Sequence, residues 1–335
     1  MLVDTGSSDQ GPRLITERGL VCHHFPWRDD FAAARNYSLS LASKSHILVL
    51  DIDELILPTD LAVLRDLIGK NAADAFYLRQ INLSDAFDTP GWLPLNALPG
   101  PSPFRASGFC QAFQVRLLPN LPQIRYQGLV HEQLEAALQA ADMRILESAV
   151  QVFHLGWLQR EADPEMNLEK AELYRRLLEE LWRAEKTARA AYYYFLAIKE
   201  PSRRIGFGLK VLADFPELRR KQEIRQLLVQ AAVDLEQWQR ALNYASRACE
   251  DGLDSVELRT LRARCLNQTG RASAALTLLE NDSGTENLPF NHYLERIRTF
   301  VLLGWKKEAA EILKLLPPGF PQAARKKLER FLGEQ

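Results

Sequence analysis

Two aspartates, Asp51 and Asp53, directly follow a strongly apolar run and are well suited to metal chemistry. The run, Ile47–Leu50, has the character of a buried parallel strand covered on both faces. In open α/β sheets, ligands lie just beyond the carboxyl ends of the strands. Carboxylates placed there can bind a divalent cation that holds a diphosphate, as in a nucleotide-sugar site. An isolated Asp-x-Asp is more often a strand end with helix-capping acids, so the surrounding sequence must decide.

The first half of the chain alternates strand and helix signals, as an α/β domain requires. Besides the apolar run, strand signals lie at residues 2–3, 19–23, 75–81, 113–118 and 150–154. Asp29 or Asp30 can cap a helix over residues 31–43, because an aspartate side chain accepts hydrogen bonds from the first free N–H groups. A second helix is expected near residues 61–69. The strand at 47–50 is therefore expected to be preceded and followed by helices.

From about Pro164 onward, helical periodicity replaces the strand signals. Three segments align at a spacing of 34 residues, beginning at Glu236, Gly270 and Gly304. A small residue recurs at the same phase of each segment, at Ala241, Ala275 and Ala309. Phe207 occupies this phase one period earlier, which predicts a divergent first repeat over residues 188–214. The spacing predicts tetratricopeptide-like pairs of antiparallel helices, and the alternative is an irregular helical bundle.

The composition sets limits on function and compartment. A chain of 335 residues predicts two domains, and a net charge of −1 indicates neither a nucleic-acid-binding surface nor an acidic tail. The four cysteines show no Cys-x-x-Cys spacing and are expected to be free thiols in a reducing compartment. No secretory signal and no transmembrane segment is visible, so the chain is expected to be cytoplasmic.

The start of the chain is unusual. Leu2-Val3-Asp4 reads as the end of a strand with no complete strand and helix before it. We therefore expect that an N-terminal piece, including the first strand of the domain, is missing or that the start was assigned late.

Six segments in the first half resemble the family 2 glycosyltransferases, which have the GT-A fold. In order, these are residues 3–9, 30–36, 48–54, 115–118, 128–132 and 154–157. Their order is similar to that of a bacterial branch in which tetratricopeptide-like repeats follow the transferase. The resemblance implies an N-terminally incomplete GT-A domain over residues 1–160, of the Rossmann-like α/β class, and an all-α repeat domain over residues 165–335.

The resemblance assigns donor-binding roles to residues on several segments. Asp4 lies where the family reads the nucleotide base, and a carboxylate can accept the imide N–H of uracil, which favours a UDP-sugar donor. Gly6 and Ser7 would form a tight turn near the donor. Arg35 and Asn36 would face the donor cleft, where an arginine can neutralise phosphate or order the acidic loop. A surface ion pair is the alternative for Arg35.

Within the acidic motif, Asp53 is expected to contact Mg²⁺ or Mn²⁺ directly. Asp51 would bind the donor ribose or sugar, or the metal through water. The bulky Ile52 is expected to point into the core, and Glu54 is interpreted as a helix-start charge. His154, at a later strand end, would reach the metal or the diphosphate, although alone it would be read as structural.

His131-Glu132 forms the second chemical centre. An inverting transferase needs a general base for the acceptor hydroxyl, and the resemblance assigns that role to Glu132. His131 would position Glu132 or contact the donor, and its alternative is a hydrogen-bonded structural histidine.

The expected reaction is therefore metal-assisted sugar transfer from a UDP-sugar to a hydroxyl of a glycan or a polypeptide. The repeats would offer a concave surface for a peptide or protein partner. The alternative is a non-catalytic protein-binding module in which the repeats carry the function and the transferase domain is degenerate.

Overall fold

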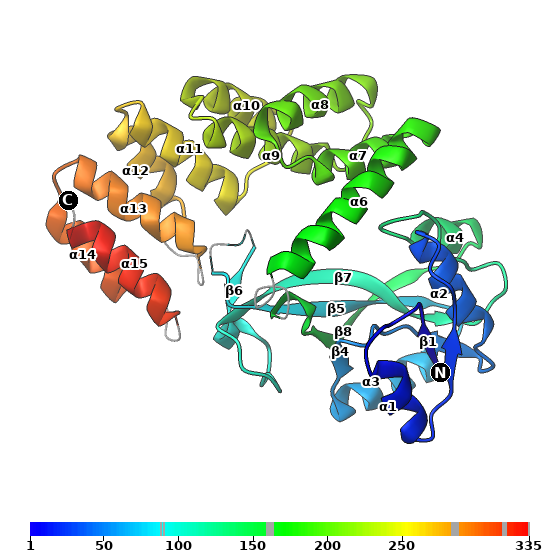
Figure 1. The fold of residues 1–335 in the computed structure, drawn as a ribbon. Helices are drawn as coiled ribbons and strands as arrows, with labels where there is room; N and C mark the ends of the chain where they lie inside the picture. Colours follow the sequence, from blue (N-terminus) through cyan, green and yellow to red (C-terminus); the bar gives the residue numbers. More distant parts are fainter. Residues whose placement is uncertain (88, 90, 159–163, 283–287, 317–319, 334–335) are drawn as a thin grey trace. The chain divides into compact units, whose positions relative to one another are not determined.

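The computed structural model describes residues 1–87, 89, 91–158, 164–282, 288–316 and 320–333 (Figure 1). These residues form two compact units, and each draws on two stretches of the chain. The first unit holds residues 1–82 and 111–184, and the second holds residues 83–110 and 185–335. Compact units need not coincide with sequence domains, so the limits of 1–160 and 165–335 stay a prediction.

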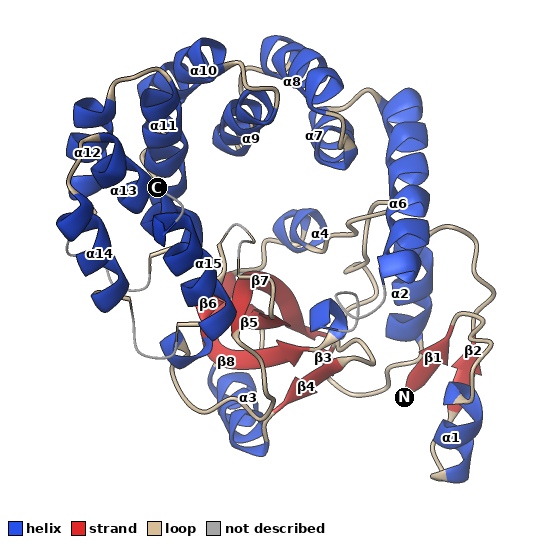
Figure 2. Ribbon diagram, turned by 60° about the vertical axis from the view of Figure 1, so that its left-hand side comes forward, coloured by secondary structure: helices blue, strands red, loops and turns tan. Residues whose placement is uncertain are grey.

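The first unit is an α/β structure, as the alternating signals predicted (Figure 2). Its strands are β1 (Leu2–Asp4), β2 (Cys22–His24), β3 (His46–Leu48), β4 (Glu54–Ile56), β5 (Ala75–Ser84), β7 (Gly108–Pro119) and β8 (Ile145–His154), with the ends of β5 and β7 reaching into the second unit. Its helices are α1 (Gly11–Glu17), α2 (Phe31–Ser40), α3 (Pro58–Lys70), α4 (Glu135–Ala140) and α6 (Pro164–Glu185). Asp30 caps α2 by accepting from the Ala33 N–H at 2.9 Å, which confirms the predicted start of that helix.

The sheet that carries the acidic motif is mixed, with the order β3-β7-β5-β8-β4 and the short β6 (Leu93–Pro94) paired to β7. The expectation of a parallel strand covered on both faces is wrong, because β3 runs antiparallel to β7 and stops at Leu48. β3 is the end strand of this order, and Leu50, two residues after it, is 40% exposed.

β1 and β2 form a separate two-stranded parallel sheet in the described structure. β1 is paired with β2, and β3 is paired with β7. The expectation that a further strand belongs beside Leu2 and Val3 stays a prediction.

The second unit is built mainly of helical hairpins. Its helices are α7 (Ala188–Ala197), α8 (Pro201–Asp214), α9 (Lys221–Asp234), α10 (Trp238–Glu250), α11 (Val256–Gln268), α12 (Ala272–Glu280), α13 (Phe290–Leu302), α14 (Lys306–Lys314) and α15 (Gln322–Gly333). The second helices of three successive hairpins begin at Trp238, Ala272 and Lys306, a spacing of 34 residues. This confirms the tetratricopeptide-like period.

The small residues lie where the period placed them. Ala241, Ala275 and Ala309 are fully buried. In the divergent first hairpin, the buried position lies one residue later than the 34-residue period predicts. Gly208 is buried there, whereas Phe207 is half-buried. A Cβ on Gly208 would lie 2.6 Å from the ring of Phe195 on α7, so the closest helix approach falls at the glycine.

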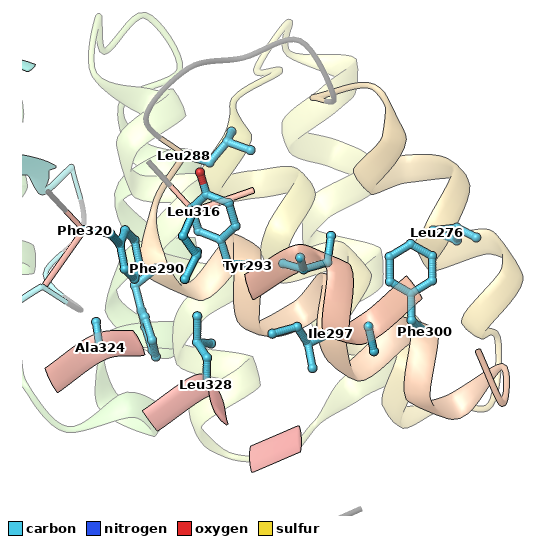
Figure 3. Packing of buried hydrophobic residues seen from close by; sticks show 12 residues of the cluster. Leu276, Leu288, Phe290, Tyr293, Ile297, Phe300, Leu316, Phe320, Ala324 and Leu328 are labelled. Atoms are coloured by element: carbon cyan, nitrogen blue, oxygen red, sulfur yellow. The ribbon is translucent and has the colours of Figure 1, made fainter. Parts of the chain in front are cut away.

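The core at the C-terminal end of the second unit is aromatic-rich (Figure 3). Tyr293 of α13 meets Phe320 edge to face, with ring centroids 5.5 Å apart. Phe87, from the segment between β5 and β7, packs its ring on Phe290 at 5.0 Å. Residues 83–110 therefore join the helical unit through side-chain packing, although the strands on both sides belong to the sheet.

Candidate active site

The acidic motif forms the short connection between β3 and β4, and its two aspartates face different partners. The Asp51 carboxylate meets Arg35, and the Asp53 carboxylate meets His154. Ile52 between them is 84% exposed, so the expectation that it points into the core is wrong. Because both neighbouring carboxylates turn toward the protein, the side chain between them turns to solvent.

Arg35 joins the acidic motif to the proposed base. Its Nη1 and Nη2 donate to the two Asp51 carboxylate oxygens at 2.8 and 3.2 Å, and its Nε donates to Glu132 Oε1 at 2.5 Å. Burial alone would lower the pKa of Arg35, but Asp51 and Glu132 outweigh it and raise the pKa. The surface-pair alternative for Arg35 does not fit this geometry, because its side chain is only 23% exposed and bridges two carboxylates. One guanidinium thus holds two carboxylates that lie 81 residues apart in the chain.

A second arginine, Arg116 of β7, supports the same motif from within the sheet. Its Nη2 lies 2.5 Å from Glu54 Oε1 and 3.7 Å from Asp51 Oδ2. Burial raises the pKa of Asp51, but Arg35 and Arg116 outweigh it, so the pKa is lowered. Glu54 is the first residue of β4 and has no exposed side-chain surface, so its interpretation as a helix-start charge is wrong.

The other end of the motif contacts the end of β8. Asp53 Oδ2 lies 3.1 Å from His154 Nε2, and His154 Nδ1 lies 2.7 Å from Asn82 Oδ1 at the paired position of β5. The hydrogen bond with His154 lowers the pKa of Asp53, although burial opposes it. The backbone supports the contact, because the Leu155 N–H donates to the Asp53 carbonyl at 3.0 Å.

The donor set fits a divalent cation bound with a ligand. With the Asn82 amide oxygen as acceptor, His154 Nδ1 carries a proton, and Nε2 either carries a second proton toward Asp53 or offers its lone pair to a cation. Carboxylate oxygens suit both Mg²⁺ and Mn²⁺, and neutral imidazole is a common metal ligand in proteins. No group of three or more His, Cys, Asp or Glu side chains among the described residues is arranged to hold a metal. Asp53 and His154 would therefore supply two ligands, and a bound diphosphate would supply others.

Gly156 makes the Asp53–His154 contact possible. A Cβ at this position would lie 2.4 Å from Asp53 Oδ2 and 2.6 Å from His154 Nε2. Any other residue would occupy the space between the two side chains, so this site requires a glycine.

Asn36 binds the backbone of Tyr126 through both ends of its side-chain amide. Its Nδ2 donates to the Tyr126 carbonyl at 3.0 Å, and its Oδ1 accepts from the Tyr126 N–H at 2.7 Å. The Tyr126 ring lies 5.6 Å from the Arg35 guanidinium, a cation–π distance. Burial raises the pKa of Tyr126 to about 12, so the phenol stays neutral. Asn36 thus positions Tyr126, which in turn lies against Arg35.

The two members of the His131-Glu132 pair face different surroundings. Glu132 belongs to the Arg35 network and is 12% exposed at its side chain. His131 is exposed, has a positive φ of 52°, and places its ring 5.9 Å from that of Tyr174 on α6. Glu132 therefore belongs to the charged network, whereas the contact described here for His131 is with Tyr174.

Asp4, Gly6 and Ser7 form a local turn at the end of β1. The Asp4 carboxylate accepts from the N–H groups of Gly6 and Ser7, each at 3.1 Å. Gly6 has a φ of 114°, which favours glycine. The hydrogen bond with Ser7 lowers the pKa of Asp4, although burial opposes it. Among the described contacts, this turn shares no hydrogen bond with the Arg35 network.

The structure thus gathers Arg35, Asp51, Asp53, Glu132 and His154, whose roles stay predictions. Sequence reasoning assigned no role to Asn82, Arg116 and Gly156, and it misread Glu54. One signal was available: an arginine inside the apolar strand 115–118 must be paired if it is buried.

Comparison with known proteins agrees with this architecture. Residues 1–115 match the family model described as glycosyl transferase family 2. A TPR repeat-containing protein from Synechococcus elongatus is 33% identical over 141 residues, which is 42% of this chain. The match covers 30% of that relative, so the chain spans less than a third of its length.

Solved structures show weaker likenesses. PilW, a type IV pilus biogenesis factor described as widely conserved, is 19% identical with a TM-score of 0.41, over 52% of this chain and 86% of that one. TarS 1–349 of S. aureus is 17% identical with a TM-score of 0.31, over 80% and 81% of the two chains. Neither likeness bears on function.

None of the described helices has both the length and the apolar character needed to cross a membrane. The family match covers the acidic motif and ends within β7, before Glu132 and β8, and the helical hairpins repeat at 34 residues. The chain thus combines an α/β unit, in which residues 1–115 match the glycosyl transferase family 2 model, with tetratricopeptide-like helical repeats.

Proposed function

We propose that this chain is an inverting glycosyltransferase that moves a sugar from a UDP-sugar donor to an acceptor hydroxyl, assisted by Mg²⁺ or Mn²⁺. The observation that carries the proposal is the Arg35 bridge between Asp51 of the acidic motif and Glu132. A donor-binding acid and a potential base are held beside each other by one rigid guanidinium. Such orientation is a large part of what a transferase supplies to its reaction.

Glu132 is the proposed general base. Its Oε1 is held by Arg35, and its Oε2 has no hydrogen-bond partner among the described residues. Oε2 can therefore take the proton of the acceptor hydroxyl as that oxygen forms its bond to the anomeric carbon. The bond from that carbon to the diphosphate breaks on the opposite face, which inverts the configuration.

Asp53 and His154 are the proposed protein ligands of the metal, and Asn82 orients His154. The cation, when bound, offsets negative charge on the departing diphosphate. Asp51 stays oriented by Arg35 and is available to the donor ribose or sugar. Asp4, with Gly6 and Ser7 in its turn, is the proposed reader of the uracil base.

The helical repeats supply a protein-binding surface in this proposal, and the acceptor is a glycan or a polypeptide. The rival function is a non-catalytic binding module with a degenerate transferase domain. The family match over residues 1–115 and the TPR name of the relative fit both functions, so donor binding must distinguish them.

The experiment is calorimetric titration of the full chain with UDP, with and without Mn²⁺. If Asp53 is a ligand, Mn²⁺ strengthens UDP binding in the wild type, and Asp53→Asn removes this gain without unfolding the protein. Asp66→Asn is the matched control, because Asp66 is an exposed acid of α3 paired only with Lys70 among the described residues. Equal metal-assisted binding in wild type and Asp53→Asn would reject the assignment, and no UDP binding by the wild type would favour the non-catalytic module.

A further inference from the structure

Among the ion pairs described for the first unit, the one between Glu54 and Arg116 is the most deeply buried. The Glu54 side chain has no exposed surface, and the Arg116 side chain is 3% exposed. Both Glu54 oxygens are used: Oε1 accepts from Arg116 Nη2, and Oε2 accepts from the Asp51 N–H at 2.8 Å. Glu54 therefore cannot be a metal or donor ligand. Buried charges are costly to retain and are weak stabilisers, so this pair calls for another explanation.

The pair is connected to the acidic loop at three points. Glu54 holds the Asp51 backbone, as described above. Arg116 Nη2 lies 3.7 Å from the Asp51 carboxylate. The Arg116 carbonyl accepts from the Val49 N–H at 2.8 Å, two residues before the loop. Both the main chain and the carboxylate of Asp51 are thus held from the interior of the sheet.

We infer that the Glu54–Arg116 pair positions the Asp51–Asp53 loop, which makes both residues positioning residues for donor and metal binding. The inference rests on the proposed function and extends it to two residues that contact neither ligand. Loss of the Glu54 charge would free Arg116 to draw Asp51 away from Arg35, because the Asp51 carboxylate is the other acid near Arg116. Asp53, two residues along, would shift from His154.

The test compares Glu54→Gln with a matched loss of charge elsewhere in the same unit. Asp74→Asn is the control: Asp74 has a side chain that is 5% exposed, is paired through both oxygens with Arg144, and directly precedes β5. In calorimetry, Glu54→Gln should lower the Mn²⁺-dependent gain in UDP binding by about 10- to 100-fold, the usual effect of losing a supporting partner. Asp74→Asn should leave the gain unchanged. An unchanged gain in Glu54→Gln, or an equal loss in both variants, would overturn the inference.

A double variant keeps the test decisive if Glu54→Gln fails to fold. Glu54→Gln with Arg116→Met removes both buried charges, a change that proteins often tolerate. We expect it to fold and still to lose at least about tenfold of the metal-dependent gain, because Asp51 has lost its interior support. A folded double variant with the wild-type gain would refute the positioning role.

The ring ¹⁵N signals of His154 provide a readout that does not depend on UDP, with His154→Gln used for their assignment. Glu54→Gln and the double variant should shift these signals in the free protein, whereas Asp74→Asn should not. If the wild type does not bind UDP but the His154 signals shift as expected, the proposed function fails and the positioning role stands. If UDP binds and the signals do not move in either variant, the positioning role fails alone.

Discussion

Gly156→Ala tests the metal site by steric means and removes no polar group. The added Cβ would lie 2.4 Å from Asp53 Oδ2 and 2.6 Å from His154 Nε2, where ordinary contacts begin at 3.4 Å. The carboxylate must therefore move by about 1 Å. Metal sites tolerate deviations of only about 0.2 Å in ligand distance, so Asp53 and His154 can no longer bind one cation together.

Gly156→Ala should have a small effect on folding stability and a large effect on metal-dependent UDP binding. The displaced atoms are the ends of side chains, so the cost to folding is at the low end of overpacking, about 1 kcal/mol. The Mn²⁺-dependent gain in UDP binding should fall by at least about tenfold. Calorimetry measures the binding, and thermal unfolding measures the stability.

Gly69→Ala is the matched control within the same unit. Gly69 lies in α3, and a Cβ there meets nothing within 4 Å. We expect unchanged UDP binding and a gain in stability of up to about 1 kcal/mol, because alanine is favoured over glycine inside helices. A Gly156→Ala protein with the wild-type metal-dependent gain would show that Asp53 and His154 do not bind the metal as a pair.

Two further predictions concern the base and the helical unit. Glu132→Gln should lower turnover by about 10²–10⁴-fold with little change in UDP affinity, and retained turnover in a sugar-transfer assay would place the base elsewhere. In the helical unit, burial lowers the pKa of His292 to about 4, and Asp282 only partly opposes this. Because the folded pKa lies below the unfolded value, stability is complete above about pH 6.5 and falls by up to about 3 kcal/mol as the pH approaches 4. Denaturant unfolding between pH 7 and 4.5 should show this loss, His292→Gln should reduce it, and identical pH profiles would contradict the assignment.

Several elements of the fold were predictable because their signals are local. The start of α2 follows from Asp30, whose side chain caps the next turn of the chain. The helical hairpins follow from a 34-residue period and from alanines that are buried at one phase. The position of Asp51 and Asp53 just after a strand also followed from the sequence alone.

The predictions that were wrong concern residues whose burial and partners are set by segments far away in the sequence. Ile52 was expected in the core, but Arg35 and His154 draw the flanking carboxylates inward and leave it exposed. Glu54 was read from its neighbours as a helix-start charge, whereas its surroundings come from Arg116, 62 residues away. The shift from Phe207 to Gly208 reflects contacts with Phe195 and Leu228 on neighbouring helices, which no period specifies.

The sequence by itself determined the α/β and repeat architecture, the acidic motif and the candidate base, because periodicity, caps and motif order act over short stretches of chain. Only the tertiary structure decided that Arg35 bridges Asp51 and Glu132, that Asn82 orients His154, and that Gly156 admits the Asp53–His154 contact. The physical reason is that a charged side chain takes its partner from whatever strand or helix the fold brings within about 3 Å. That distance is set by the pairing order of the strands, which apolar patterns alone do not encode.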